Sequence, residues 1–347
     1  MKRIVKAILL AALVPVLSFA QTDLQPAATV NLTKTEPITV KQLKAEITKI
    51  EVQSKRTLSV PERRQVLDIM INERLAMQAS ERDKLGLTEN ELNQQMQQAR
   101  NMMKQKIGRD PTDKEFEEAV KAETGLKLAD FKEQMRRQLT IQKYLMTKKR
   151  SLFEGIKPPT DAEILSMYEL SKAKLVRPDT VRFTIIFVAR GEGADGQRKA
   201  KEIADKLAAE IGHNSTKFDE ISLRSQKPNA GFQAGDGGYL PKSAEAQQVV
   251  GIDFMNALFA LKNGEVSRVL ETPRGCQIVK VTETYVQKTL ELNDPYQLGT
   301  PGTVKDYIGN MLLQQRQQKV VEEATLELVK ELRSGNPYKV FDKNLEW

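Results

Sequence analysis

The 347-residue chain has 40% hydrophobic and 29% charged residues, a balance that is ordinary for a soluble protein, and only 5% aromatic residues. Its formal net charge is +8, but acidic and basic residues alternate, as in "KEFEEAVKAE", instead of gathering into the basic face of a nucleic-acid-binding protein. One histidine and one cysteine exclude a structural zinc site and an internal disulfide. We expect no cofactor and no metal.

Residues 1–20 predict a secretory signal peptide. "MKRIVKAILLAALVPVLSFAQ" begins with basic residues, continues with an apolar run and ends in the small-x-small pattern Ser18-Phe19-Ala20, so cleavage is expected after Ala20. No cysteine lies near this point to carry a lipid anchor, and no later stretch approaches the roughly 20 apolar residues of a membrane span. We therefore expect a mature chain in the periplasm or another extracytoplasmic compartment.

Residues 21–177 predict a helical module. One helix begins near Thr39, and the next begins at Ser59 with Pro61 in its first turn and ends at Gly86. Thr88 and Glu91 then form a capping box, a device that "DPTDKEFEEAVKAETG" repeats. "LADFKEQMRRQLTIQKYLMTKKR" has apolar residues at helical spacing, and "TDAEILSMYELSKAKL" predicts one more helix after the break at "IKPPT".

The sequence pattern changes at residues 178–292, which predict an α/β domain. "VRFTIIFVAR" alternates like a strand, "GQRKAKEIADKLAAEI" is helical, and the shorter helices "FDEISLRSQ" and "DFMNALFALKNG" precede a β-branched strand, "GCQIVKVTETYV". Residues 293–347 contain one long amphipathic helix and a short extended tail. This order predicts an α+β chain in which an α/β domain is inserted into a helical module, with the last helix packing back on the first ones.

A glycine motif follows the first strand of this domain. Gly191, Gly193 and Gly196 match the G-x-G-x-x-G pattern of dinucleotide-binding proteins between a strand and a helix. Glu192 and Asp195 would repel a pyrophosphate, and the second strand of such a unit is missing. The motif is interpreted as a solvated loop.

The same domain carries a second pattern: "KFDEISLRSQ", the glycine-rich turn "AGDGGYL", and "DFMNALFALKNGEVSRVLETPRGCQIVKV". Residues 178–290 thereby resemble the parvulin-type (PpiC) peptidyl-prolyl isomerase domain. The flanking segments "RRQVLDIMINERLAMQASERDKLGL" and "ADFKEQMRRQLTIQKYL", with the final helix and tail, are similar to the periplasmic chaperone SurA and its relatives. In that family the N-terminal helices and a late C-terminal helix form a chaperone module around parvulin domains.

The resemblance implies a site whose catalytic residues are substituted. The two family histidines fall at Thr184 and Gln277, the family's Cys or Asp falls at Lys227, and the apolar residue of the glycine-rich turn falls at Gly237. An apolar proline pocket remains, with Phe254 flanked by Val250 and Phe259. Such a pocket can favour the twisted amide and lower a barrier of about 18–20 kcal/mol without a nucleophile. We expect weak catalysis or none, and peptide binding by these residues: Val250, Phe254, Phe259, Thr184 and Gln277.

Four residues allow a structural and a functional interpretation. His213 is expected in a solvated loop, and Cys276 is expected to be a small core residue of its strand. Phe254 can be a pocket wall or a core residue, because its helix is amphipathic. Met102 and Met103, among glutamines, are the candidate exposed patch for client polypeptides, since methionine adapts to varied apolar partners.

The function predicted from these features is an ATP-independent chaperone that binds unfolded or partly folded exported polypeptides. Two alternatives stay open: an active parvulin-type isomerase acting on exported proteins, and a surface scaffold or adhesin with a single partner. No nucleic-acid partner is expected. The sequence leaves the clients and the oligomeric state open.

Overall fold

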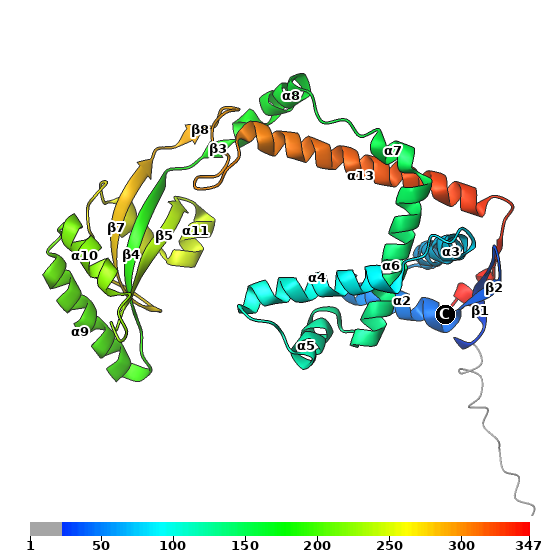
Figure 1. Ribbon diagram of the computed structural model, residues 1–347, viewed down its shortest axis with the longest axis horizontal. Coiled ribbons are helices and arrows are strands. Elements are labelled where there is room, and N and C mark those ends of the chain that lie inside the picture. Colours follow the sequence, from blue (N-terminus) through cyan, green and yellow to red (C-terminus); the bar gives the residue numbers. More distant parts are fainter. Residues whose placement is uncertain (1–22) are drawn as a thin grey trace, which may run out of the picture. The chain divides into compact units, whose positions relative to one another are not determined.

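The computed structural model describes residues 23–347, which form two compact units (Figure 1). The first unit contains the chain up to Ile156 together with Arg316–Trp347, and the second contains Lys157–Gln315. Both units contain helices and strands, so the α+β prediction is confirmed. The predicted signal peptide and its cleavage after Ala20 lie outside the described residues.

Helices make up most of the first unit. They are α2 (Val40–Ser54), α3 (Val60–Arg82), α4 (Glu89–Ile107), α5 (Asp113–Thr124), α6 (Leu128–Lys148), the short α7 (Arg150–Glu154) and the second half of α13 (Val304–Arg333). The capping boxes predicted at Thr88 and in the following helix, at Thr112, are confirmed. The predicted end of α3 at Gly86 is wrong. Lys84 adopts a left-handed backbone with φ 56°, and the Leu85 N–H donates to the Ser80 carbonyl, so the helix stops at Arg82.

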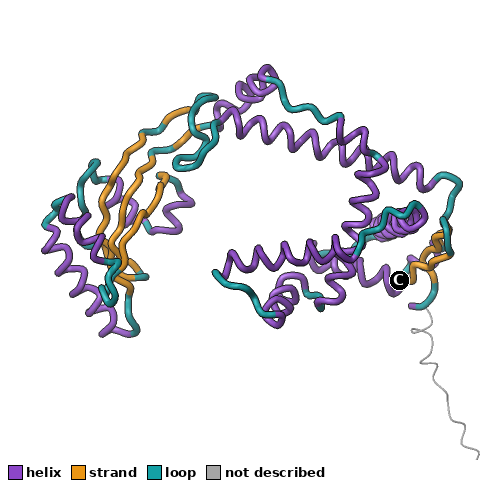
Figure 2. The backbone as a smooth tube through the Cα atoms, in the orientation of Figure 1, coloured by secondary structure: helices purple, strands orange, loops and turns teal. Residues whose placement is uncertain are grey.

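The first unit also contains a small sheet that the sequence patterns do not predict. β1 (Pro26–Asn31) lies between β2 (Thr35–Thr39) and β9 (Tyr338–Val340), and both neighbours are antiparallel to it (Figure 2). A 3-10 helix, η2 (Asp342–Leu345), follows β9. The two ends of the described chain are therefore paired in one sheet.

The core of the first unit joins residues from both of its segments. Leu328 and Leu332 of α13 and Leu345 of the tail pack in one buried cluster with the sheet and with α2, α3 and α6. Further buried members of this cluster are Ala27, Ala28, Val30, Ile38, Leu43, Leu67, Ile71, Leu75 and Tyr144.

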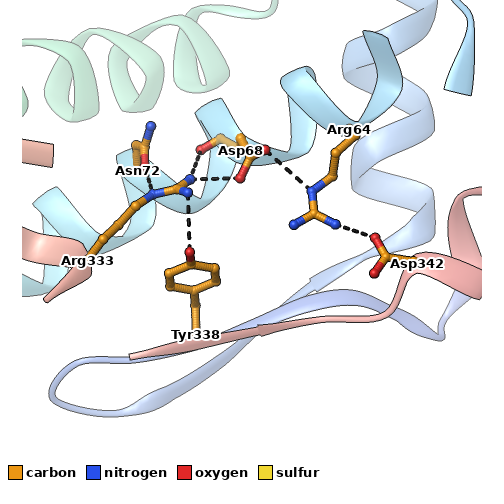
Figure 3. Close-up of polar contacts among 6 residues, drawn as sticks. All are labelled: Arg64, Asp68, Asn72, Arg333, Tyr338 and Asp342. Carbon is orange, nitrogen blue, oxygen red and sulfur yellow. Dashed lines mark hydrogen bonds and ion pairs between the residues drawn. The ribbon is translucent and has the colours of Figure 1, made fainter. Parts of the chain in front are cut away.

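Polar contacts fix the end of α13 and the tail on α3 (Figure 3). Arg333 donates to the Asp68 carboxylate at 2.8 Å and to the Tyr338 hydroxyl at 3.3 Å. On the other side of Asp68, Arg64 forms an ion pair with Asp342 of the tail and contacts the Asp68 carboxylate at 3.4 Å. These side chains are partly exposed, so their main effect is to fix the register of the tail, and the apolar core supplies most of the stability.

The second unit is built on a four-stranded antiparallel sheet of order β5-β4-β7-β6. Its strands are β4 (Thr180–Ala189), β5 (Gln233–Pro241), β6 (Leu270–Thr272) and β7 (Gly275–Tyr285). Figure 1 shows α9 (Gly193–Ile211) and α10 (Ser215–Arg224) on one face of the sheet and α11 (Ala244–Val250) on the other, where α12 (Ile252–Phe259) also packs.

The prediction of a turn at "AGDGGYL" is wrong, because these residues pair with β4 along the length of β5.

A further part of the second unit lies beside the sheet domain. α8 (Asp161–Ser171), the 3-10 turn η1 (Lys172–Lys174), and the paired strands β3 (Val176–Arg177) and β8 (Lys288–Thr289) belong to it. Ile164 and Tyr168 of α8 pack with Val304 and Ile308 at the start of α13. The compact units therefore divide at 156/157 and 315/316. The domain limits predicted at 177/178 and 292/293 stay predictions.

Acid is expected to destabilise the α3–α4 connection. Lys143 and the capping Thr88 hold the pKa of Glu91 near 2, below its ordinary value of 4.5. Because the folded pKa is depressed, this stabilisation is complete above pH 4.5 and is lost as the pH falls toward 2. Replacing Glu91 with Gln should make the decline of the thermal midpoint over this range shallower. The matched control is Glu117→Gln, at an exposed glutamate with no ion pair among residues 23–347, and an unchanged acid profile in Glu91→Gln would contradict the prediction.

Candidate functional site

Cross-strand register decides which predicted site residues meet. Side chains alternate between the two faces of a strand. Ile186 and Val188 of β4, with Ile278 of β7, face α9 and α10, whereas Phe183 and Val279 face α12. The sheet thus has two separate apolar layers, one on each face.

Phe254 lies at the centre of the α12 layer. Its side chain is only 6% exposed, and its ring meets the Phe183 ring edge-on, with centroids 5.9 Å apart. The buried neighbours of this pair are Val181, Leu258, Val279 and Val281. Of the two interpretations of Phe254, the structure supports the core residue.

The other predicted pocket residues lie at the rim of this layer. Val250 and Phe259 are partly buried against it, and the Lys242 ammonium lies 5.5 Å from the centroid of the Phe259 ring. Val249 and Ile252, which flank Val250 where α11 meets α12, are 75% and 54% exposed. The accessible apolar surface on this side of the domain therefore includes the α11–α12 junction, while Phe254 lies beneath it.

Thr184 and Gln277 do not share a face. Thr184 pairs with Lys280 and has the parity of Ile186, so it faces α9 and α10. Gln277 has the parity of Val279 and faces α12. The placement of Thr184 with Phe254 is therefore wrong. The β4 residue that packs on the Phe254 side is Ile185.

The resemblance places both family histidines in one network, and the β4 residue that shares a face with Gln277 is Ile185, not Thr184. An isoleucine there can neither donate nor accept a hydrogen bond. The amide of Gln277 donates to the Thr272 hydroxyl at 3.1 Å, at the end of β6. No imidazole therefore replaces the histidine network on this face, because the single histidine of the chain, His213, lies in the turn between α9 and α10.

The surroundings of Thr184 are those of a structural layer. Its hydroxyl oxygen is buried and has no hydrogen-bond partner among the described residues. The neighbouring Lys280 side chain is 9% exposed, forms an ion pair with Asp219 of α10 and lies 5.4 Å from the centroid of the Phe218 ring. Lys227, beyond the end of α10, is exposed. Neither Thr184 nor Lys227 contributes to the Phe254 cluster.

Gly237 explains why the glycine-rich strand lacks a larger residue. A Cβ atom at this position would lie 2.3 Å from the Phe183 ring, far inside van der Waals contact. The Phe183 ring therefore occupies the space that a side chain at Gly237 would fill. The large side chain at this place therefore comes from β4 and not from β5, which is a steric reason for Gly237. Spacing within the sequence does not reveal this contact.

His213 and Cys276 occupy structural positions. His213 is exposed, with φ 60°, and its Nδ1 lies 3.0 Å from the Val266 carbonyl oxygen. Cys276 is 4% exposed in the α9 layer, and burial raises the pKa of its thiol, which disfavours the thiolate. Both agree with the structural interpretations from the sequence.

The glycine motif is a tight strand-to-helix turn. A Cβ at Gly196 would lie 2.3 Å from the Gly191 carbonyl carbon. The close approach of the two backbone segments is enough to account for both glycines.

Met102 and Met103 separate into an exposed and a packed residue. Met102 is 69% exposed, and Met103 is partly buried in a small cluster where α4, α5 and the start of α6 meet. Adjacent residues in a helix point about 100° apart, which is why the pair cannot form one patch. Methionine is frequent in this cluster, whose other members are Met96, Ala99, Phe116, Val120, Leu128, Phe131 and Met135.

Among residues 23–347, no helix is both long and apolar enough to cross a membrane.

Comparison with known proteins finds family matches for two segments of the chain. Residues 159–294 match the PPIC-type PPIase domain, and residues 1–145 match the SurA-like N-terminal domain. The foldase protein PrsA of Clostridium botulinum (strain Loch Maree) is 25% identical over 285 residues, which cover 81% of this chain and 74% of the relative. PrsA of Staphylococcus aureus (strain Newman) is 34% identical over 90 residues, 26% of either chain.

A similar solved structure comes from Campylobacter jejuni, where PEB4 and Cj1289 are described as two related SurA-like chaperones. It is 14% identical, covers 91% of this chain and 100% of its own, and has a TM-score of 0.41. The sequence relatives, with the two domain matches, support a chaperone or foldase role. The chain is therefore similar to the SurA-like N-terminal domain over residues 1–145 and to the PPIC-type PPIase domain over residues 159–294.

Proposed function

We propose that the mature chain is an extracytoplasmic, ATP-independent chaperone for unfolded or partly folded exported polypeptides, and that its PPIC-type domain is weak or inactive as an isomerase. The observation that supports weak or absent isomerase activity is the composition of the sheet face on which Phe254 packs. Ile185 packs on this face, Gln277 shares it by strand parity, no imidazole lies on it, and Phe254 is buried. A catalytic site needs groups that stabilise the transition state more than the ground state, and this face offers few polar atoms for that purpose.

The chaperone half is supported by adaptable apolar surface in the SurA-like domain. Met102 and Ile107 of α4 are 69% and 42% exposed beside the methionine-containing cluster of α4, α5 and α6. Flexible, polarizable thioethers accept apolar segments of varied shape, which suits a protein with many clients and modest affinity. We propose this surface as a client-binding site and the α11–α12 junction, with Val249 and Ile252, as a second one.

Two measurements on the mature chain test the proposal. Exchange spectroscopy on a panel of X-Pro peptides, with the protein at catalytic amounts, should show no clear acceleration at any X. Light scattering of two unrelated chemically unfolded proteins should show suppressed aggregation without ATP. Clear acceleration would support the active isomerase instead. If neither activity is present but one protein forms a saturable complex, the single-partner scaffold would be supported.

The client surface is tested by Met102→Ser, which should weaken aggregation suppression several-fold while the thermal midpoint stays unchanged. The matched control is Met146→Ser, at a methionine of α6 that is 48% exposed and lies outside the α4–α5–α6 cluster. Equal suppression by both variants would remove Met102 from the proposed site.

A further inference from the structure

A groove runs between α9 and the edge of the sheet in the PPIC-type domain. A hollow of about 330 Å³ is lined by Lys201, Asp205 and Ala208 of α9 and, across from them, by Arg268, Val269 and Glu271. A much smaller hollow continues past Glu271 toward Cys276. This groove lies on the α9 side of the sheet, apart from the Phe254 cluster.

The wall of the groove opposite α9 is a free sheet edge. β6 is the last strand of the sheet and is paired on one side, by β7. Before it, the Ser267 N–H donates to the Val279 carbonyl, and the Val279 N–H donates to the Ser267 hydroxyl at 2.9 Å. Both bonds point inward to β7. The backbone groups of residues 268–271 that point away from β7 have no strand partner among the described residues, as at any sheet edge.

Charged side chains lie on both walls of the groove. Lys201 and Glu271 form an ion pair across the groove. Asp205 and Arg268 are exposed and form no ion pair within residues 23–347. The groove thus presents one unpaired charge of each sign beside a row of backbone donors and acceptors, which matches an extended polypeptide that carries both kinds of charge.

We propose that this groove binds an extended segment of a client polypeptide, which adds to β6 as a fifth strand. Backbone hydrogen bonds to the 268–271 edge supply affinity that is independent of side-chain sequence, and alternate side chains of the segment enter the hollow above Ala208. The proposal rests on the proposed function only for the class of ligand. It adds a site on the face opposite Phe254, where no proline is required.

The probe is a fluorescein-labelled 12-residue peptide of alternating valine and threonine with one glutamate, one lysine and no proline. Fluorescence anisotropy with the whole mature chain should show saturable binding. A copy of the peptide with N-methylated backbone amides has the same side chains but cannot donate along the edge. Its affinity should be at least tenfold lower, and equal affinity would overturn strand addition.

Two pairs of protein variants locate the site. Ala208→Trp fills the hollow and should weaken binding at least tenfold, whereas Ala209→Trp, on the exposed side of the same helix, should not. Arg268→Glu changes an exposed side chain without disturbing the core, and it should weaken binding several-fold relative to Arg274→Glu in the neighbouring turn. Wild-type affinity in both Ala208→Trp and Arg268→Glu would overturn the proposal.

No saturable binding of the probe to the wild-type chain would also overturn it. In that case aggregation suppression by the same protein preparation would leave the chaperone proposal standing. If the wild-type chain neither binds the probe nor suppresses aggregation, both the groove proposal and the chaperone proposal would be contradicted.

Discussion

Removal of residues 334–347 is expected to unfold the first unit. The deletion takes away β9, so β1 loses the partner that pairs with its residues Ala28 and Val30. It also removes Leu345, which is 2% exposed in the core. Truncating one such leucine to alanine costs about 2–5 kcal/mol, and the complete folding free energy of a domain is about 5–15 kcal/mol. The combined loss of stability from the strand and the leucine should exceed the folding free energy of the first unit.

Amide NMR spectra of the deletion variant should show collapsed dispersion for residues of the SurA-like domain, while resonances of the β4–β7 sheet persist as an internal reference. Leu345→Ala in the full chain should lower the stability by about 2–5 kcal/mol in urea unfolding. The matched control is Lys343→Ala, at an exposed residue of the same 3-10 helix, which should change stability by less than about 0.5 kcal/mol. A well-dispersed deletion variant would show that the tail is dispensable.

Features with a local cause could be predicted from the sequence. Thr88 and Thr112 precede helices with glutamate three residues later, and both caps are present because a capping box depends only on neighbouring residues. The strands β1 and β2 were not predictable in the same way. They are short, β2 contains Pro37, and β1 also pairs with a strand more than 300 residues away in sequence, as the pairing of Val30 with Tyr338 shows.

The candidate site was less predictable because a strand changes face at every residue. Thr184 and Ile185 are adjacent in β4, yet Thr184 faces the α9 layer and Ile185 packs in the Phe254 layer. The steric exchange between Phe183 and Gly237 depends on contact across two strands, which no spacing within one segment reveals. Sequence patterns therefore located the domain, whereas the face of each side chain could be assigned only from the register.

Phe254→Ala is expected to destabilise the PPIC-type domain by about 3–5 kcal/mol. The ring is 6% exposed, and its removal leaves a cavity among Phe183, Leu258 and Val279 and abolishes the edge-on ring contact. Urea unfolding followed by the amide signals of β4 and β7 measures the loss. The matched control is Ile252→Ala in the same helix, where the side chain is 54% exposed and the change should be less than about 0.5 kcal/mol.

This prediction separates a pocket wall from a core residue. A wall of an open peptide pocket can be truncated with little effect on stability, because water or a ligand already contacts it. A core residue cannot, because its neighbours relax only partly into the space it leaves. A decrease in unfolding free energy below about 1 kcal/mol in Phe254→Ala would therefore show that the ring borders an accessible pocket. That result would support proline binding at this face. A loss of the expected size would mean that any peptide must bind above the ring, at the rim formed by Val250, Ile252 and Phe259.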